Sequence, residues 1–382
     1  MNFELSDELV TLRDAVRKFA QEVIAPNARA WDRDGDIPDE VYGQLGELGL
    51  MGLAVPAELN GSGLSQLGST VVIEEIARHC GATALMLCAH NGLCISHLLV
   101  AASDEQKRRY LPKLATGEHI GAWGLTETTC GSDAAALQTT AVADGNEWVI
   151  NGNKMFITNG GKADLFVIMA VTDPGGERGR NISAFLVESG TKGLLVGNKE
   201  DKMGVRASNT VPLTFEDLRV PKGNLCGRLG EGYKDAMKVL NGGRASIAAL
   251  SVGLGRGALE EALAYAQQRE TFGKLLVEHQ AVQFMLADMA VDVDAARLLV
   301  RRAATLRDAG ESSRIEAAIA KLFASEMATR AALNAIQICG GYGYMKDMPV
   351  ERYMRDAKLM EIGEGTSQIQ RLVIARWLLD ED

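Results

Sequence analysis

The sequence lacks the long apolar segment that would cross a lipid bilayer. No run of consecutive apolar residues in the 382-residue chain approaches the roughly 18 to 20 that a membrane-spanning helix needs. The first residues, from Met1 to Val23, mix acidic and basic side chains at helical spacing and do not resemble a targeting segment. We therefore expect no membrane span, a mature chain that begins near Met1, and a cytoplasmic location.

The chain also lacks paired metal ligands and surplus positive charge. Its six cysteines include no C-x-x-C pair, and its five histidines show no H-E-x-x-H spacing. This scatter argues against a zinc site or a disulfide framework and favours reduced thiols packed as small apolar groups. A formal net charge of −10 argues against an extended nucleic-acid-binding face. We expect no metal and no nucleic-acid partner.

Helical patterns dominate the first part of the chain. The 47% hydrophobic content supports a large core, which at this length divides into two or three domains. Apolar residues recur at steps of three and four from Leu9 to Val23 after a cap at Ser6, and Pro26 should end or kink this helix. Further apolar-periodic runs cover roughly 68–101.

A capping-box pattern marks one more helix in this part. Ser103 and Gln106 open a helix over 104–115, which Pro112 should distort. The sequence therefore predicts an all-helical N-terminal domain over residues 1–121.

Beyond residue 121 the sequence pattern changes from helices to short strands. Trp148 to Ile150 and Lys154 to Thr158 are rich in β-branched and aromatic residues, and they flank Asn151-Gly152, which is a strong hairpin-turn signal. Further strands are predicted at 165–171, 182–187 and 210–215. Short strands with no helical pattern between them favour a small antiparallel barrel or sandwich, here over residues 122–231.

The helical period returns for the last part of the chain. One apolar stripe runs from Val282 through Met289 to Val300, and similar patterns cover 233–270, 313–338 and 367–379. Long helices joined by short loops predict an antiparallel four-helix bundle over residues 232–382. The fold class is thus α+β, with a helical N-terminal domain, a β-barrel or sandwich in the middle, and a C-terminal bundle.

One glycine-rich stretch superficially suggests a dinucleotide loop. Gly253-Leu254-Gly255-Arg256-Gly257 lies within a helical run and no strand precedes it, whereas a Rossmann loop joins a strand to a helix. Close helix packing through small residues is the better interpretation.

Six motifs carry the functional signal of the sequence. In chain order they are Gly124-Leu125-Thr126-Glu127 with Gly131-Ser132-Asp133; Lys154-Met155-Phe156-Ile157-Thr158-Asn159-Gly160; Arg269-Glu270-Thr271-Phe272-Gly273-Lys274; Gln337-Ile338-Cys339-Gly340-Gly341-Tyr342-Gly343; Glu351-Arg352 with Arg355-Asp356-Ala357-Lys358; and Glu364-Gly365-Thr366-Ser367-Gln368. Each is weak alone. Together, in this order and over nearly the whole chain, they resemble the acyl-CoA dehydrogenase family.

This resemblance implies that FAD is held between the β domain and the bundle. The residues similar to those that line one side of the flavin ring are Trp123, Leu125, Thr126, Ser132, Phe156, Ile157 and Thr158. Thr126 and Thr158 would offer hydrogen bonds to the ring edge that accepts hydride. Without the resemblance, either threonine would be interpreted as an ordinary strand residue.

The resemblance also implies a homotetramer in which a neighbouring subunit contacts each flavin. The residues that look like those contacts are Arg269, Thr271, Phe272, Gln280, Gln337, Gly340 and Gly341. Arg269 would pair with the pyrophosphate, although by itself it would be interpreted as a solvated helix-end charge. Thr366 and Gln368 resemble further flavin contacts at the start of the last helix.

Glu364 is the predicted catalytic base. The reaction implied by the family takes a proton from the α carbon of an acyl-CoA and passes hydride from the β carbon to flavin N5, giving the trans-2-enoyl-CoA. A carboxylate is a weak base, so the thioester carbonyl must be polarised as enolate character develops, and burial should raise the pKa of Glu364. The alternative is a helix-capping glutamate before Thr366.

The sequence itself limits where the base can be. Some relatives place the base on another helix, and the similar segment here is Asn241-Gly242-Gly243-Arg244, in which Gly243 stands where that carboxylate would be. Glu364 is therefore the available base. By the same resemblance, Asn241, Arg244, Ser132 and Gly365 would contact the substrate.

Two departures from the family pattern bear on the substrate. Gly363 stands where many straight-chain enzymes have a bulky aromatic, and Thr128-Thr129-Cys130 replaces a turn that more usually contains proline. The space left by the missing ring leads us to expect a short or branched acyl group.

Several functions remain open on this fold. An acyl-CoA oxidase is disfavoured because such enzymes usually carry an extra C-terminal domain, and a flavin-dependent hydroxylase because it generally lacks the glutamate. A glutaryl-CoA dehydrogenase, which decarboxylates its product, remains an alternative. A non-catalytic acyl-CoA-binding or assembly protein would be expected to have lost the base or the flavin contacts. If the chain is a dehydrogenase, electron-transfer flavoprotein is its expected electron acceptor.

Overall fold

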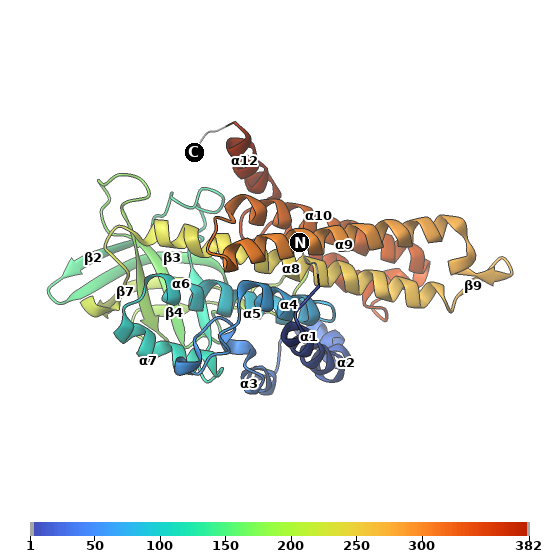
Figure 1. Cartoon of the computed structure of the whole chain (residues 1–382). Coiled ribbons are helices and arrows are strands. Elements are labelled where there is room, and N and C mark those ends of the chain that lie inside the picture. Colours follow the sequence, from blue (N-terminus) through green and yellow to red (C-terminus); the bar gives the residue numbers. More distant parts are fainter. Residues whose placement is uncertain (1–3, 380–382) are drawn as a thin grey trace.

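The computed structural model describes residues 4–379 and contains N-terminal helices, a β domain and a long helical bundle (Figure 1). Residues 1–3 and 380–382 of the two outer predicted domains lie outside the described residues. The N-terminal helices are α1 (Asp7–Phe19), η1 (Ala20–Ile24), α2 (Ala25–Asp34), α3 (Asp39–Glu47), η2 (Leu50–Gly52), η3 (Ala57–Leu59), α4 (Gln66–Ala77), α5 (Gly81–Leu87), η4 (Cys88–Ile95), α6 (Ser96–Ala101) and α7 (Asp104–Ala115). The predicted succession of a helical N-terminal part, a β domain and a helical C-terminal part is confirmed.

The first helix does not end at Pro26. Ser6 caps α1 as predicted, because its Oγ accepts a hydrogen bond from the Leu9 N–H at 3.4 Å. Beyond Phe19 the chain passes through the π-helical turn η1 into α2, and Pro26 lies in the first turn of α2. Proline is tolerated there, since its missing N–H is not needed in the first turn and the irregular ladder lies in the π turn before it.

The capping box at Ser103 is confirmed. The Gln106 N–H donates to Ser103 Oγ at 3.2 Å, and the Ser103 N–H donates to Gln106 Oε1 at 3.0 Å. Helix α7 runs through Pro112 to Ala115.

The helical segment Gly81–Ala101 is long and apolar. By length and composition alone it could cross a membrane, with a mean hydropathy of 1.6. However, 61% of its apolar 18-residue window is buried inside the protein, and Leu87, Ile95 and Leu98 are fully enclosed. It therefore has the character of a core helix.

The β domain is one eight-stranded sheet with the order β6-β7-β3-β2-β4-β5-β8 and β1 beside β4. Its elements are β1 (Gly121–Gly124), β2 (Thr140–Asp144), β3 (Glu147–Thr158), β4 (Leu165–Val171), β5 (Ile182–Glu188), β6 (Leu194–Val196), β7 (Thr210–Pro221), η5 (Lys222–Asn224) and β8 (Leu225–Cys226). All the predicted strands are present. The sheet is mixed and not antiparallel throughout as predicted, because β4 pairs in parallel with β1 and β2.

The predicted hairpin turn at Asn151-Gly152 is wrong. Both residues lie inside β3, where the register with β7 shifts at a bulge, and the hairpin between β2 and β3 instead turns at residues 145–146. Gly152 has φ 142°, and a Cβ there would lie 2.5 Å from Thr139 Oγ1. Asn151 Oδ1 accepts from the Asp217 N–H at 2.8 Å. Contacts with residues distant in sequence therefore place Gly152 in a β-bulge and not in a hairpin turn.

The C-terminal part is dominated by three long helices. Its elements are α8 (Gly232–Ala266), β9 (Glu270–Thr271), β10 (Lys274–Leu275), η6 (Leu276–Glu278), α9 (Gln280–Asp308), α10 (Arg314–Cys339), η7 (Gly340–Tyr344), α11 (Val350–Met360) and α12 (Ser367–Leu378). The predicted stripe along α9 is confirmed at Met289, Val293, Ala296 and Val300, which are buried.

The fourth helix of the bundle is α11. It packs on both α8 and α10, whereas α12 packs mainly on α10 and projects from the bundle in Figure 1. The predicted helix over 367–379 therefore forms, but outside the four-helix core.

The glycines at 253, 255 and 257 are packing residues of α8, as predicted. A Cβ at Gly253 would lie 2.5 Å from the Glu74 carbonyl oxygen, and one at Gly255 would lie 2.6 Å from Met327 Sδ. Helix α8 can therefore lie directly against α4 and α10.

Candidate active site

Glu364 lies in the short segment between α11 and α12. The Gly363 N–H donates to the Leu359 carbonyl at 2.8 Å at the end of α11, and Thr366 Oγ1 caps α12 by accepting from the Ile369 N–H at 3.2 Å. Between these fixed points Glu364 has φ 50° and Gly365 has φ 89°. A left-handed conformation is unfavourable for glutamate, and such strain often occurs at functional sites.

The carboxylate of Glu364 occupies the space beside Gly243. A Cβ at position 243 would overlap Glu364 Oε2, so a larger residue there would require the carboxylate to move. Glu364 Oε2 is buried and has no hydrogen-bond partner among the described residues. Burial raises the pKa of Glu364 to about 7, while the positive charges of Lys321 and Arg244 act to lower that pKa. Glu364 is thus a stronger base than an exposed glutamate.

Arg244, a predicted substrate residue, lies within electrostatic range of Glu364. It is buried, and its Nη1 donates to Asn241 Oδ1 at 2.8 Å, one helical turn earlier in α8. The structure therefore brings Asn241, Arg244, Glu364 and Gly365 together, as the sequence predicts.

Several buried polar atoms around Glu364 lack hydrogen-bond partners within residues 4–379. Besides Glu364 Oε2 they are Arg244 Nε, Ser367 Oγ and Gln370 Oε1. An unpaired buried donor or acceptor is costly, and most are satisfied in native proteins. The mixture of donors and acceptors here matches a polar ligand, such as a thioester or a flavin edge.

The β domain presents the other predicted flavin residues along β1 and β3. Trp123 and Leu125 are buried, Thr126 and Thr158 are half-buried, and Ser132 lies in an exposed loop. The Trp123 Nε1–H donates to the buried His97 Nδ1 at 3.3 Å.

Two residues of the Phe156–Thr158 stretch point in opposite directions. Phe156 has φ 60° and its side chain is 63% exposed, whereas Ile157 is buried in the core of the sheet. Ile157 can therefore offer a ligand only its backbone.

A buried ion pair joins the first two motifs. Lys154 Nζ, on β3, donates to Glu127 Oε1 at 2.6 Å and to the Leu125 carbonyl at 3.2 Å. Glu127 also accepts from the N–H groups of Gln138 at 2.6 Å and Thr139 at 3.1 Å. Both side chains of the pair are fully enclosed. The pair fixes the loop after β1 to β3, and sequence reasoning gave neither residue this role.

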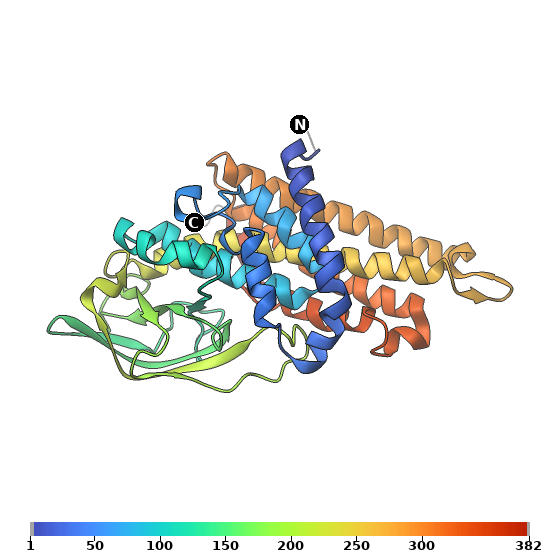
Figure 2. The ribbon, with the colours of Figure 1, turned by 90° about the horizontal axis from the view of Figure 1, so that it is seen from below.

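The second predicted set of flavin residues lies at the far end of the bundle. The β9–β10 hairpin, which carries Thr271 and Phe272, projects opposite the β domain in both views (Figures 1 and 2). Tyr342, just after Gly340-Gly341, contacts Tyr265 near the end of α8, with ring centroids 6.3 Å apart. Of this set Thr271 is half-buried, and Arg269, Phe272, Gln280, Gln337, Gly340 and Gly341 are exposed. Within a single chain, this second set of residues therefore lies away from Glu364.

Lys321 and Gln370 are site residues that sequence reasoning missed. Lys321 Nζ donates to the Gly365 carbonyl at 2.7 Å, and Gln370 Nε2 donates to the same oxygen at 2.9 Å. A signal for Lys321 was available, because it lies on the buried stripe of α10 with Ala317 and Ala324. A lysine on an apolar helix face needs a specific partner.

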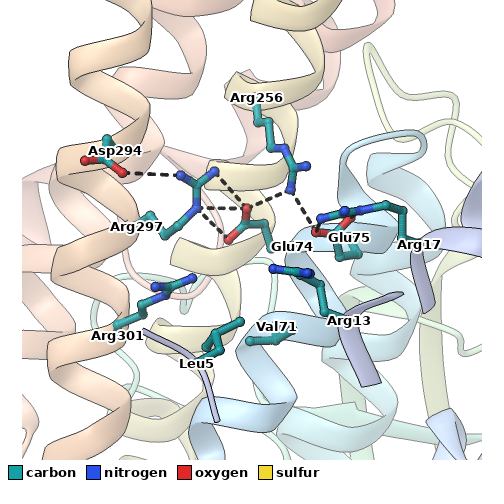
Figure 3. A pocket seen from close by; sticks show the side chains of 10 residues that line it. All are labelled: Leu5, Arg13, Arg17, Val71, Glu74, Glu75, Arg256, Asp294, Arg297 and Arg301. Carbon is teal, nitrogen blue, oxygen red and sulfur yellow. Dashed lines mark hydrogen bonds and ion pairs between the residues drawn. The ribbon is translucent and has the colours of Figure 1, made fainter. Parts of the chain in front are cut away.

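A surface cavity of about 360 Å³ lies elsewhere, between α1, α4, α8 and α9 (Figure 3). Its charges pair with one another: Arg256 and Arg297 bind Glu74, while Arg17 and Arg256 bind the buried Glu75. This network ties the N-terminal helices to the bundle. Each carboxylate that lines the cavity, on Glu74, Glu75 and Asp294, has an ion pair.

Glu364, with a strained backbone and a buried, unpaired Oε2 among residues 4–379, lies where α8, α10 and the start of α12 meet. The chain matches the models of the acyl-CoA dehydrogenase N-terminal domain over residues 6–118, the middle domain over 122–218 and the C-terminal domain over 230–379. The chain belongs to the acyl-CoA dehydrogenase family. It is therefore an oxidoreductase of the acyl-CoA dehydrogenase class.

Similar proteins share this length and fold. A Bacillus subtilis protein named "Probable acyl-CoA dehydrogenase YngJ" is 49% identical over 99% of this chain and 100% of its own length. A short-chain specific acyl-CoA dehydrogenase of Clostridium acetobutylicum is 46% identical, covering 98% of this chain and 99% of that protein.

Solved structures agree with this assignment. Butyryl-CoA dehydrogenase from Megasphaera elsdenii superposes with a TM-score of 0.97 at 39% identity, over 99% of this chain and 100% of that one. A chain from a study of the electron transferring flavoprotein of Acidaminococcus fermentans gives 0.97 at 43% identity, over 99% and 100%. A glutaryl-coenzyme A dehydrogenase in complex with glutaryl-CoA gives 0.96 at 37% identity, over 100% and 98%.

Proposed function

We propose that Glu364 removes the α proton of a short-chain acyl-CoA thioester in an FAD-dependent α,β-dehydrogenation. The observation that carries this proposal is Glu364 Oε2, which is buried without a hydrogen-bond partner among the described residues, on a side chain whose pKa is raised to about 7. A base with this pKa is half ionised near neutral pH, and it binds a proton more strongly than an exposed glutamate. FAD, when bound, supplies the acceptor for the hydride that leaves the β carbon.

The residues of the chain suit the binding of substrate beside Glu364. Arg244 places a buried positive charge next to the base and has an unused Nε donor. With Asn241 and Ser132 it would contact the CoA thioester. The N–H of Glu364 would polarise the thioester carbonyl, and that bond would strengthen as negative charge moves onto the carbonyl oxygen. Burial of the site keeps water from competing for the base.

The donor set also fits FAD between the β domain and the bundle. Thr126 and Thr158 offer half-buried hydroxyls, and Trp123 and Leu125 offer an apolar face. Ser367 Oγ and Gln370 Oε1 are buried and unpaired near the start of α12, where Thr366 and the exposed Gln368 would add contacts. The positive end of this helix suits phosphate groups.

We propose that a homotetramer completes each flavin site. Arg269, Thr271 and Phe272 lie at the end of the bundle opposite the β domain, so they can reach a flavin only in another subunit. The exposed apolar side chains support such an interface, since Phe272 is 99% and Tyr344 81% exposed, and Phe284 and Val291 project from α9. Assembly would cover these groups.

A short or branched acyl group is the proposed substrate. Gly363 leaves the α-carbon side of Glu364 without a ring, and its nearest neighbour for a Cβ is the Leu359 carbonyl at 3.5 Å. Relatives named short-chain specific and butyryl-CoA dehydrogenase support the short-chain choice.

The electron acceptor and location follow from the same relatives. The similarity to a chain studied with an electron transferring flavoprotein supports that protein as the acceptor. We place the enzyme in the cytoplasm, by analogy with its bacterial relatives.

Anaerobic titration of the purified holoprotein tests this function. Butyryl-, isovaleryl-, glutaryl- and octanoyl-CoA are added separately while the flavin absorbance is followed. We expect bleaching by butyryl- or isovaleryl-CoA at far lower concentration than by octanoyl-CoA. Comparable reduction by octanoyl-CoA would refute the short-chain assignment, release of CO₂ from glutaryl-CoA would indicate the decarboxylating reaction, and a protein that purifies without flavin would favour a non-catalytic role. Rapid reoxidation by oxygen alone would indicate an oxidase.

A further inference from the structure

Lys321 is a fully buried lysine that donates a hydrogen bond to the residue after the proposed base. It projects from α10, and its Nζ donates to the Gly365 carbonyl at 2.7 Å. Gln370, on α12 and also fully buried, donates to the same carbonyl at 2.9 Å. Two side chains from two helices thus hold one carbonyl oxygen.

The carbonyl that they hold belongs to a strained turn. Glu364 and Gly365 have φ 50° and 89°, and glutamate does not adopt this conformation without support from its surroundings. The direction of the Glu364 side chain depends on this backbone. Fixing the Gly365 carbonyl therefore fixes the place where the carboxylate enters the space beside Gly243.

The charge of Lys321 has one acidic neighbour that lacks an ion pair. Burying an ammonium beside only a neutral carbonyl is costly, so a nearby anion is required. Glu326 pairs with Arg371 at 2.7 Å, and Glu361 pairs with Lys358 at 2.7 Å. Glu364 has no ion pair within 4 Å among the described residues, and it lies within electrostatic range of Lys321.

We propose that Lys321 is a positioning residue for Glu364, which holds the Gly365 carbonyl together with Gln370 and stabilises the carboxylate form of the base with its charge. This inference rests on the proposed role of Glu364. It adds a charged residue from α10 to a site otherwise built from α8 and the α11–α12 segment.

The charged and titratable groups around the pair determine the expected pH dependence. Glu364 is near Lys321 on α10, Arg244 on α8 and the Cys88 thiol on η4, while Lys321 is near Glu326, Glu361 and Arg244. Burial lowers the pKa of Lys321 to about 8, so it is charged where Glu364 titrates. Removing this charge raises the pKa of Glu364, because the ionised carboxylate loses an attraction.

The pH profile of kcat/KM for flavin reduction in Lys321→Met tests the proposal. The acid limb should move about one pH unit to higher pH, so that activity falls about tenfold at pH 6. A smaller pH-independent loss, from release of the Gly365 carbonyl, should remain at pH 9. Lys321→Arg should restore the position of the acid limb, because it keeps the charge.

Matched variants separate this role from a loss of folding. Lys202 is a half-buried lysine whose pKa is likewise lowered to about 8 chiefly by burial, and its Nζ donates to the Ser208 carbonyl at 2.8 Å. Lys202→Met should leave the acid limb in place. Gln370→Leu should reduce the rate without moving the acid limb, because it removes a neutral donor, and this test remains if Lys321→Met does not fold.

Two results would overturn the proposal. One is an acid limb in Lys321→Met that coincides with that of wild type, and the other is an equal shift in Gln370→Leu. Full activity of Glu364→Gln is a different failure, since it would remove the base itself and with it the proposed function.

Discussion

Gly243 on α8 faces the carboxylate of Glu364, so closely that a Cβ at position 243 would overlap Glu364 Oε2. The two positions are more than a hundred residues apart in the sequence, yet a side chain at position 243 would occupy the same space as the Glu364 carboxylate. The carboxylate of Glu364 can occupy this place because α8 has no side chain at position 243.

Gly243→Ala should disable the enzyme without unfolding it. The added methyl group must push the carboxylate away from its position, and a displacement of about 1 Å at a reacting group can cost on the order of a hundredfold in rate. The measurement is the rate of anaerobic flavin reduction by butyryl-CoA, with flavin content and Tm measured alongside. Gly43→Ala is the control, because a Cβ at Gly43 meets nothing within 4 Å. Equal rates for the two variants would contradict the account.

Because positions 243 and 364 border the same space, we expect that the catalytic carboxylate can be transferred from position 364 to position 243. Glu364→Gly should be inactive, and adding Gly243→Glu to it should recover a measurable part of the activity, because a carboxylate on α8 points toward the vacated space. Position 243 lies within α8, where its backbone accepts any L residue without a positive φ. A double variant no faster than Glu364→Gly alone would show that the two positions do not serve the same substrate atom.

Stability should respond to pH through Glu364. Its pKa is about 7 in the folded protein and near 4.5 when the chain unfolds, so the folded state holds a proton that the unfolded state releases between these values. The free energy of unfolding therefore falls as pH rises through this window, by roughly 3 kcal/mol at most. Glu364→Gln should lack this decrease in the free energy of unfolding, because glutamine does not titrate.

Thermal unfolding at saturating FAD measures this effect. The Tm of Glu364→Gln minus that of wild type should be smallest at pH 5 and should grow up to pH 8. Taking the difference cancels the other titrating groups. A difference in Tm that is constant from pH 5 to pH 8 would mean that Glu364 has an ordinary pKa.

The Lys154–Glu127 pair should be required for both stability and flavin retention. Burial lowers the pKa of Lys154 to about 8, opposed by Glu127, and the pKa of Glu127 stays low because Lys154 and backbone donors outweigh its burial. Lys154→Met leaves a buried, unpaired carboxylate, which typically costs about 3–5 kcal/mol. We expect a large loss of Tm and of bound flavin.

The exposed pair Lys113–Glu118 provides the comparison. Lys113→Met removes an ion pair of similar length at the surface, where such pairs contribute about 0–1 kcal/mol. An equal decrease in Tm for Lys154→Met and Lys113→Met would show that the buried pair contributes no more to stability than the exposed pair.

The sequence predicted the features that depend on local patterns. The caps at Ser6 and Ser103, the stripe along α9 and the packing role of Gly253 and Gly255 all follow from neighbours within a few residues. The change from helices to strands and back is equally local, and it gave the three-part fold.

The features that it missed depend on contacts distant in sequence. Asn151-Gly152 has the local signature of a hairpin, but the hydrogen bonds of Asn151 to Asp217 and the closeness of Gly152 to Thr139 make it a bulge. Lys321 acquires its role from a carbonyl 44 residues away.

The distribution of the site residues was only partly predictable. The family motifs grouped Arg244 with Glu364, and the structure brings both together. The roles of the flavin residues remain predictions, and seven of them lie away from Glu364 and would need the proposed second subunit.

The most direct measurement for the central claim is the rate of flavin reduction in Glu364→Gln. Stopped-flow mixing with butyryl-CoA under anaerobic conditions compares this variant with wild type at equal flavin content. The account predicts that the thioester still binds and that reduction slows by a factor on the order of a thousand or more, because glutamine keeps the shape of the side chain but cannot accept the α proton. Reduction at the wild-type rate would contradict it, and the base would have to be sought elsewhere.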